Sequence, residues 1–429
     1  MLRPNLASAS VIAFFASAPV AASAATVSPP AYHVSMTVAL GAPDRWDYVV
    51  FDPASHRVFV AHADRVTVVD GRDGKILGNV EGMPGGTHGI AVSPATGRGY
   101  TDDGRAGMVT TFDLVTFKAI KQIKAEEDAD GIILDPTSHN IFVIDGDSGK
   151  LTVIDPKTEE PIATIDAGGG LEFGVSGANG KLYIDGAERN EIVRVNTLTN
   201  SVDAHWPMPG CAKPHGIAID TATHRLFASC ANQVLTVVNA ENGAVIAALP
   251  IGQRNDGASF DPRRKLIFTS NGDGTLSVIQ EKNADTYVSR GDIKTAVTGR
   301  TMDIDPESGR LYVAAADIDT AAAPAPNGRP KIVPGSLKLL FLDPPANDSL
   351  AYTGEELAKD AKISMDQASA IALKARPGKI TDKELEREPG GSGLRYSFDI
   401  KSGGFTYEVG VDAKTGKVLE NKKEGTNPD

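Results

Sequence analysis

Polar side chains that could bind a ligand or transfer a proton recur along this chain at intervals of 41 to 44 residues. A carboxylate can hold a cation, an imidazole can act as an acid, a base or a metal ligand, and a guanidinium can stabilise an oxyanion. At the fourth position of the series stands Leu171, and Glu172 beside it in a Gly-rich loop supplies the polar group. The candidate site residues are therefore Asp47, His88, Asp130, Glu172, His215, Asp256 and Arg300.

Each candidate precedes a short apolar strand that ends in Asp-Pro or a similar pair, such as YVVFDP at Asp52-Pro53 and GIILDP at Asp135-Pro136. Seven such units follow one another, and each divides into about four strands with turns rich in Gly, Asp and Asn. Repeats of this length predict an all-β fold, a seven-bladed β-propeller. The segment His33–Leu40 is predicted to close the ring by supplying the strand that the last unit lacks.

The first strand of a propeller blade lines the central channel, so the seven candidates are predicted to lie together at one mouth of that channel. The loop after the second strand of each unit reaches the same face. It is predicted to carry a second ring of side chains, namely His62, Asp102, Asp145, Asp185, Cys230, Asn271 and Ala315.

Residues 1–24 have the pattern of a secretory signal peptide, with Arg3, an apolar stretch and the small-x-small site Ala22-Ser23-Ala24. The sequence therefore predicts export, to the periplasm or beyond the cell, and no transmembrane segment in the mature chain. Cys211 and Cys230 are the only cysteines. In an oxidising compartment they are predicted to form a structural disulfide, and a metal or redox role is the alternative.

The net charge of −12 restricts the class of partner. Residues 358–429 are nearly neutral, so the excess of acid lies before them. A negative field of this kind repels phosphate backbones and disfavours nucleic acid as a general partner. An envelope protein or a small ligand is the partner that we expect instead.

The character of the sequence changes after Pro345. A linker at 344–361 is expected, followed by a small α+β C-terminal domain at 362–424. It begins with a helix at 364–375 that has Ser364 as its N-cap, and strand-like segments with Gly-rich turns follow.

Several motifs carry a resemblance to known families. The seven units, with DGTLSVI at 273–279, GRTMDIDP at 299–306 and IVPGS at 332–336, resemble the exported YVTN-type, YncE-like propellers across residues 32–343. The tail, with QASAIALKARPGKI and YEVGVDAKTGKVLE, resembles a PepSY domain. The first resemblance implies a bacterial envelope protein that binds nucleic acid or other ligands, without an established catalytic activity. The second implies peptidase inhibition or protein interaction.

Four interpretations of the rings remain open at this stage. In the first, the mouth binds a small ligand or a divalent cation, and the sequence identifies no other cofactor. In the second, the mouth is the active site of a lactonase- or lyase-like enzyme. In the enzyme, His88 or His215 would be the acid or base, Glu172 its partner and Arg300 the oxyanion group. Alternatively the chain is a protein-docking scaffold, or the side chains only cap strands and hydrogen-bond neighbouring blades.

Overall fold

The computed structural model describes residues 29–30, 32–323, 330–345 and 352–423. The segment predicted to be a signal peptide, residues 1–24, lies outside these described residues. Among the helices of the described part, none is long and apolar enough to cross a membrane.

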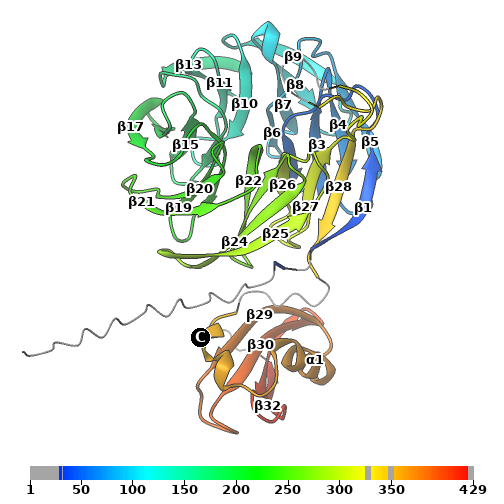
Figure 1. The fold of residues 1–429 in the computed structure, drawn as a ribbon, viewed down its shortest axis with the longest axis vertical. Coiled ribbons are helices and arrows are strands. Elements are labelled where there is room, and N and C mark those ends of the chain that lie inside the picture. The colour runs from blue at the N-terminus through cyan, green and yellow to red at the C-terminus, as the bar shows by residue number, and fades with distance from the viewer. Residues whose placement is uncertain (1–28, 31, 324–329, 346–351, 424–429) are drawn as a thin grey trace, which may run out of the picture.

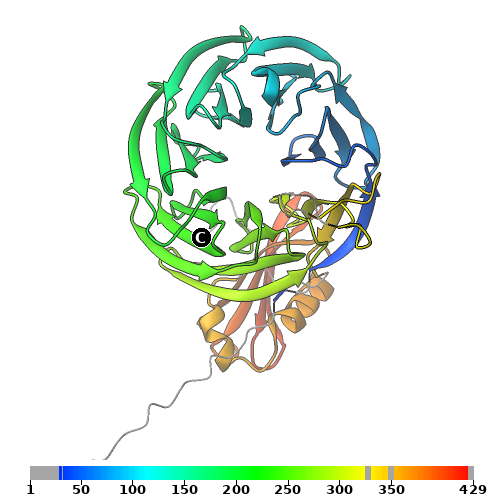
Figure 2. The ribbon, with the colours of Figure 1, turned by 45° about the horizontal axis from the view of Figure 1, so that its top comes forward.

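Between His33 and Asp343 the described chain forms seven four-stranded antiparallel sheets, which Figure 2 shows arranged as a ring. The innermost strands are β2 (Val49–Asp52), β6 (Ile90–Ser93), β10 (Ala129–Leu134), β14 (Gly174–Ser176), β18 (Pro214–Asp220), β22 (Asn255–Asp261) and β26 (Thr301–Ile304). The second strands are β3 (Arg57–His62), β7 (Arg98–Asp103), β11 (Ile141–Asp145), β15 (Lys181–Gly186), β19 (Arg225–Cys230), β23 (Leu266–Asn271) and β27 (Leu311–Ala315). A short 3-10 helix, η1 (Gly104–Ala106), follows β7.

The third strands of the same sheets are β4 (Arg65–Asp70), β8 (Met108–Asp113), β12 (Lys150–Asp155), β16 (Glu191–Asn196), β20 (Val234–Asn239), β24 (Thr275–Asn283) and β28 (Lys338–Asp343). The outermost strands are β5 (Ile76–Glu81), β9 (Ala119–Lys124), β13 (Glu160–Asp166), β17 (Ser201–Pro207), β21 (Val245–Pro250), β25 (Thr286–Lys294) and β1 (His33–Ala39). The result is an all-β, propeller-like fold.

Strand β1 is the one strand in these sheets that comes from a distant part of the sequence. It pairs antiparallel with β28, from His33 opposite Asp343 to Ala39 opposite Lys338. Met36 and Val38 are half-buried on its inner face and pack against the core between the first and last sheets, whereas Thr37 is exposed. The alternation of exposed and half-buried residues is that of a strand with one face against a core.

Apolar side chains fill the spaces between neighbouring sheets, and the Asp-Pro pairs build the turns at one end of the innermost strands. Asp52 Oδ1 accepts a hydrogen bond from Ala54 N at 3.2 Å, and Asp261 Oδ1 accepts one from Arg263 N at 2.9 Å. Asp side chains that bond the backbone two residues later are a common way to hold such turns. These carboxylates are therefore structural, and they lie at the opposite end of the strands from the candidate site.

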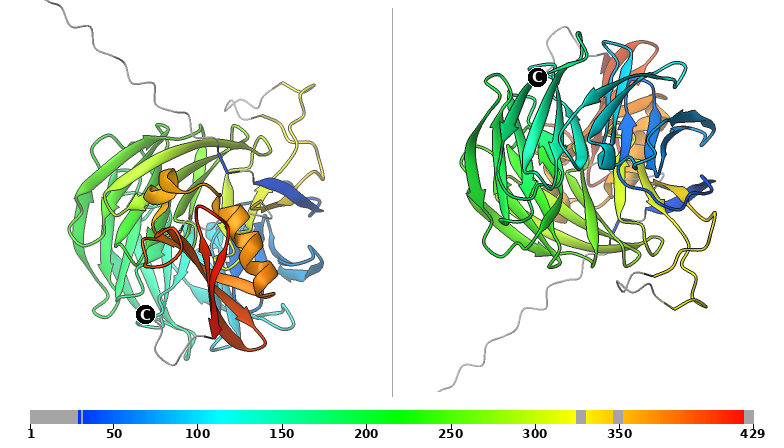
Figure 3. Two further views of the ribbon diagram at one scale, coloured as in Figure 1. Left: turned by 90° about the horizontal axis from the view of Figure 1, so that it is seen from below. Right: turned by 90° about the horizontal axis from the view of Figure 1, so that it is seen from above.

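The C-terminal domain has one sheet of order β29-β30-β31-β32 packed against helix α1. Its elements are α1 (Met365–Ala375), β29 (Lys379–Glu386), β30 (Arg395–Ser402), β31 (Phe405–Asp412) and β32 (Val418–Lys423), and the 3-10 helix η2 (Glu355–Asp360) precedes them. The predicted helix and its N-cap are confirmed: Ser364 Oγ accepts a hydrogen bond from Gln367 N, and the Gln367 side chain accepts one from Ser364 N. The domain lies below the ring in Figure 1, and Figure 3 shows it from below.

Candidate functional site

A cavity of about 420 Å³ runs along the centre of the ring and is lined by the innermost strands of all seven sheets. Tyr48 and Phe173 meet across it with ring centroids 4.4 Å apart, in a stacked arrangement. They come from the first and fourth sheets, so they approach from opposite sides of the channel. Most other sheets carry Gly at this level, as at Gly89 and Gly216.

These glycines let adjacent innermost strands approach closely. A Cβ on Gly89 would lie 2.1 Å from Asp130 O, and one on Gly216 would lie 2.9 Å from the backbone of Gly257. Larger residues would push the strands apart. Close approach at this level narrows the channel just below the candidate site.

The seven candidate residues all lie within two residues of the start of an innermost strand, and all seven are half-buried. They therefore surround one end of the channel, which we call the channel mouth. The sequence analysis missed three side chains at the mouth, namely Arg45, beside His88, and the aromatic pair Tyr48 and Phe173. The repeat alignment contains a signal for the aromatic pair, because Tyr48 and Phe173 replace the Gly of other units.

Four of the candidates form a connected group on one side of the mouth. Arg300 Nη1 makes an ion pair with Asp256 Oδ2. His215 Nδ1 lies 3.3 Å from Glu172 Oε1 and 4.0 Å from Asp256 Oδ1. The hydrogen bond with Glu172 raises the pKa of His215 above its ordinary value, and burial opposes it.

His88 has a different partner from the one the sequence suggested. Its Nδ1 lies 2.8 Å from Asp102 Oδ2, and the other oxygen of Asp102 accepts hydrogen bonds from His88 N and Gly89 N at 2.8 and 2.7 Å. The Asp102 side chain is completely buried, so the imidazole is held in one orientation. Arg45 Nη2 lies 3.3 Å from His88 Nε2 and donates to it when the imidazole is neutral.

The charges around His88 strongly favour its protonated form. Burial lowers the pKa of His88, but the hydrogen bond to Asp102 and the nearby carboxylates Asp130 and Asp47 outweigh it and raise the pKa to about 9. A histidine fixed by a buried carboxylate can serve as a cationic binding group or, if its proton is removed, as a general base.

Asp47 and Asp130 differ from the other candidates because their carboxylates accept no hydrogen bond within the described part of the chain. Burial raises the pKa of Asp47 to about 6, although Arg300 opposes the shift. Burial, with Asp47 as a neighbouring negative charge, raises the pKa of Asp130 well above its ordinary value. Two desolvated carboxylates without donors favour a ligand that supplies positive charge or N–H groups.

The second predicted ring lies at the ends of the second strands and is buried throughout. Most of it serves the structure: His62 contacts Thr67 Oγ1 at 2.9 Å and Pro43 O at 2.7 Å, and Asn271 donates to Ser277 Oγ at 3.0 Å. Asp185 is the exception, because neither of its buried oxygens has a hydrogen-bond partner within the described residues. Burial raises its pKa well above the ordinary value.

The predicted disulfide is confirmed. Cys211 and Cys230 are bonded, with their Cα atoms 5.4 Å apart. The bond ties the loop before β18 to the end of β19, and β18 carries His215. It therefore holds one wall of the channel mouth. Among the described residues no three His, Cys, Asp or Glu side chains converge as a metal-binding group would.

The C-terminal sheet and helix can be assigned to a family. Residues 362–422 match the PepSY family. The family is described as "Peptidase propeptide and YPEB domain", and the match covers the PepSY domain from just before α1 to β32. The PepSY resemblance seen in the tail is thus supported. No curated protein has a sequence that matches the chain.

Solved structures resemble the ring of sheets. Hydrazine synthase of Kuenenia stuttgartiensis matches with a TM-score of 0.55 and 16% identity, over 62% of this chain and 91% of that one. The structure of U3-55K and the WD40 repeats of RRP9 each match with a TM-score of 0.61 and 11% identity, over 73% of this chain and 99% of theirs. At these identities the likeness shows a propeller-like fold and nothing about activity.

Proposed function

We propose that this chain is an exported binding protein of the bacterial cell envelope, in which a closed seven-bladed propeller of the YVTN-type, YncE-like kind occupies residues 32–343. A linker at 344–361 joins it to a PepSY-like interaction or inhibitory module at 362–424. The disulfide, which requires an oxidising compartment to persist, supports export. The pairing of β1 with β28 supports closure by the N-terminal strand, because it leaves β28 covered on both sides.

The proposed binding site is the channel mouth, and its ligand is a small organic cation such as an amine. The observation that carries this proposal is the pair of desolvated carboxylates Asp47 and Asp130, which lack hydrogen-bond donors beside a stacked Tyr48 and Phe173. An ammonium group there would gain ion pairs with the carboxylates and a favourable contact with the aromatic faces. Arg300 and His215 on the other side could hold an acidic group of the same ligand.

A panel of small amines and amino acids, followed by thermal shift and calorimetric titration, tests the proposal. We expect saturable binding of one class of amine, reduced at least about tenfold by Asp130→Asn. The exposed Asp166 offers a matched control, and Asp166→Asn should leave the affinity unchanged. Binding that is equal in both variants, or binding only of acids without an amine, would contradict the proposed site.

An enzyme at the same mouth is the second candidate, and one observation favours it. The buried Asp102 fixes His88 through Nδ1, as an orienting group does for a general base. Lactone hydrolysis that is lost in His88→Ala and falls with the protonation of His88 would support this candidate. Turnover that is insensitive to both His88→Ala and His215→Ala would exclude these roles.

A further inference from the structure

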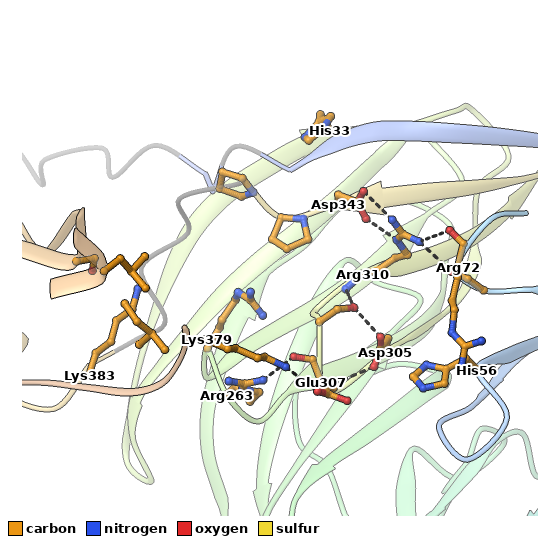
Figure 4. Close-up of a pocket in the computed structure, with 18 of the residues that line it drawn as sticks. His33, His56, Arg72, Arg263, Asp305, Glu307, Arg310, Asp343, Lys379 and Lys383 are labelled. Carbon is orange, nitrogen blue, oxygen red and sulfur yellow. Dashed lines mark hydrogen bonds and ion pairs between the residues drawn. The ribbon is translucent and has the colours of Figure 1, made fainter. Parts of the chain in front are cut away.

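A second cavity of the described structure lies away from the channel mouth. It is a cleft of about 1060 Å³ between the opposite face of the ring and the PepSY domain. Its walls come from the turns of the first, sixth and seventh sheets on one side and from α1 and β29 on the other. Figure 4 shows residues of both walls directed toward the space between them. We call this space the interdomain cleft.

The interdomain cleft is basic although the chain as a whole carries a net charge of −12. Six guanidinium or ammonium groups and two imidazoles line it, against three carboxylates. The permanently charged groups are Arg72, Arg263, Arg264, Arg310, Lys379 and Lys383. A local concentration of positive charge in an acidic molecule attracts an anionic partner to this place.

Several of these cations already hold carboxylates, which shows what they are arranged to bind. Arg310 contacts Asp343 through two nitrogens, at 2.5 and 2.9 Å, in the side-by-side geometry that a guanidinium forms with a carboxylate. Lys379 Nζ lies 2.8 Å from Glu307 Oε1. This pair joins the two walls, and both side chains are 62% exposed, so an entering carboxylate can replace Glu307 at little cost.

Arg72 is the cation most available to a partner. It is exposed in the turn between β4 and β5, and its guanidinium makes no hydrogen bond or ion pair within the described residues. Arg263 Nη1 donates only to a backbone oxygen, Glu307 O, at 2.8 Å. Neither guanidinium forms an ion pair with a carboxylate of the described residues, so both leave positive charge on the ring side of the cleft.

The cleft also has an apolar part. Leu373, Ala370 and Ile380 of the PepSY domain and Pro344 and Pro345 of the ring side line it. Leu373 is 37% exposed, so part of its side chain is open to a ligand in the cleft. A free phosphate or sulfate would fill a small part of 1060 Å³ and would gain nothing from these apolar side chains.

We propose that the interdomain cleft binds an extended acidic peptide segment of a protein partner, whose Asp or Glu side chains pair with Arg72, Arg263 and Lys379 and whose apolar side chains pack on Leu373 and Ile380. Clusters of Arg and Lys are a recurrent means of recognising acidic motifs. A bound peptide contacts both walls, so it fixes the PepSY domain against the ring. This site is independent of the channel mouth, because the two lie at opposite ends of the innermost strands.

A peptide-display experiment on the full chain tests the proposal. Random twelve-residue peptides are selected on the folded protein, and the selected peptides are titrated against the double variant Arg72→Glu, Lys379→Glu. We expect the selected peptides to be enriched in Asp and Glu with interspersed apolar residues, and the variant to bind them at least about tenfold more weakly.

The matched control is the double variant Lys157→Glu, Lys401→Glu. Lys157 occupies in the third sheet the turn position that Arg72 has in the first, and Lys401 lies opposite Lys379 in the PepSY sheet. The control makes the same change in net charge in the same two parts of the molecule, and it should bind as the unaltered protein does. Equal thermal unfolding of both variants shows that they fold.

Three results would overturn the proposal. Selected peptides without enrichment in acidic residues would contradict the assigned chemistry, and equal loss of affinity in both variants would show a general charge effect. Competition by inorganic tripolyphosphate at micromolar concentration would show that the cleft recognises a phosphate-like anion and not a peptide.

Discussion

At the scale of single residues, the channel mouth combines charged side chains that have partners of opposite charge with two carboxylates that have no hydrogen-bond donor within the described residues. His215, Asp256 and Arg300 have partners within the ring, and His88 has Asp102. Asp47 and Asp130 have no donor within the described residues, and their carboxylates are desolvated. A side chain kept in such a state costs stability, so its presence at a concave mouth favours a role in binding.

The pH dependence of stability provides a test at this scale. The pKa of Asp47 is raised from 3.8 to about 6, so the folded protein holds this proton more tightly than the unfolded chain does. The stability from this group is complete below pH 3.8 and is lost as the pH rises through 6. We expect Asp47→Asn to be more stable than the unaltered protein at pH 7 by about 1 to 3 kcal/mol, with a flatter profile between pH 4 and 6.

Denaturant unfolding at a series of pH values measures this effect. The raised pKa of His88 acts in the same direction at higher pH, because its stabilising charge is lost between pH 6.5 and about 9, and Asp47→Asn should retain most of this second slope. The exposed Asp166→Asn is the control, with the profile of the unaltered protein. A profile of Asp47→Asn that is parallel to the control would show that Asp47 is not desolvated.

At the scale of elements, the disulfide fixes the loop that precedes β18 and thus the position of His215. It closes a loop with a sequence separation of 19 residues, for which the loss of unfolded-state entropy corresponds to about 3 kcal/mol. We expect Cys211→Ala, Cys230→Ala to lower the free energy of unfolding by about this amount in guanidinium titrations. Reduction of the unaltered protein should give a similar loss, and no change on reduction would contradict the assignment.

Strand β1 gives a second prediction at this scale. Val38 lies on the inner face of β1 and packs on the core between the first and last sheets, whereas the neighbouring Thr37 is exposed. Val38→Asp places a charge in that core and should destabilise the protein by more than about 2 kcal/mol. Thr37→Asp is the matched control and should change stability by less than about 0.5 kcal/mol. Equal effects of the two changes would mean that β1 does not seal the ring.

The sequence predicted individual strands well where apolar alternation and turn residues agreed. The expected strand at His33–Leu40 is β1, His33–Ala39, and the expected helix after Ser364 is α1. The partners of the site residues were predicted less well. Tyr48 and Phe173 are far apart in the sequence and meet only because their sheets face each other across the channel, and Asp102 was placed in a second ring but not on His88. Such contacts depend on the direction in which each side chain points, and the spacing of the repeats does not predict that direction.

At the scale of the whole molecule, the two proposed sites lie on opposite faces of the ring. The channel mouth is at the start of the innermost strands, and the interdomain cleft is at the turns that follow their ends. The direct ion pair between the walls of the cleft joins two exposed side chains, Lys379 and Glu307. An interface held by exposed charges permits movement of one domain relative to the other. Because the two proposed sites lie on opposite faces, a small ligand and a protein partner could be bound at the same time.

The central claim is that the channel mouth is a ligand site, and native mass spectrometry of the protein isolated from its native source tests it most directly. We predict a stoichiometric small organic cation on the unaltered protein and the bare chain mass for Asp130→Asn, His215→Ala, with the variant still folded as judged by circular dichroism. A bare mass for both proteins would contradict the claim. So would a variant that keeps the ligand, or one that loses it together with its fold, because these side chains would then be structural.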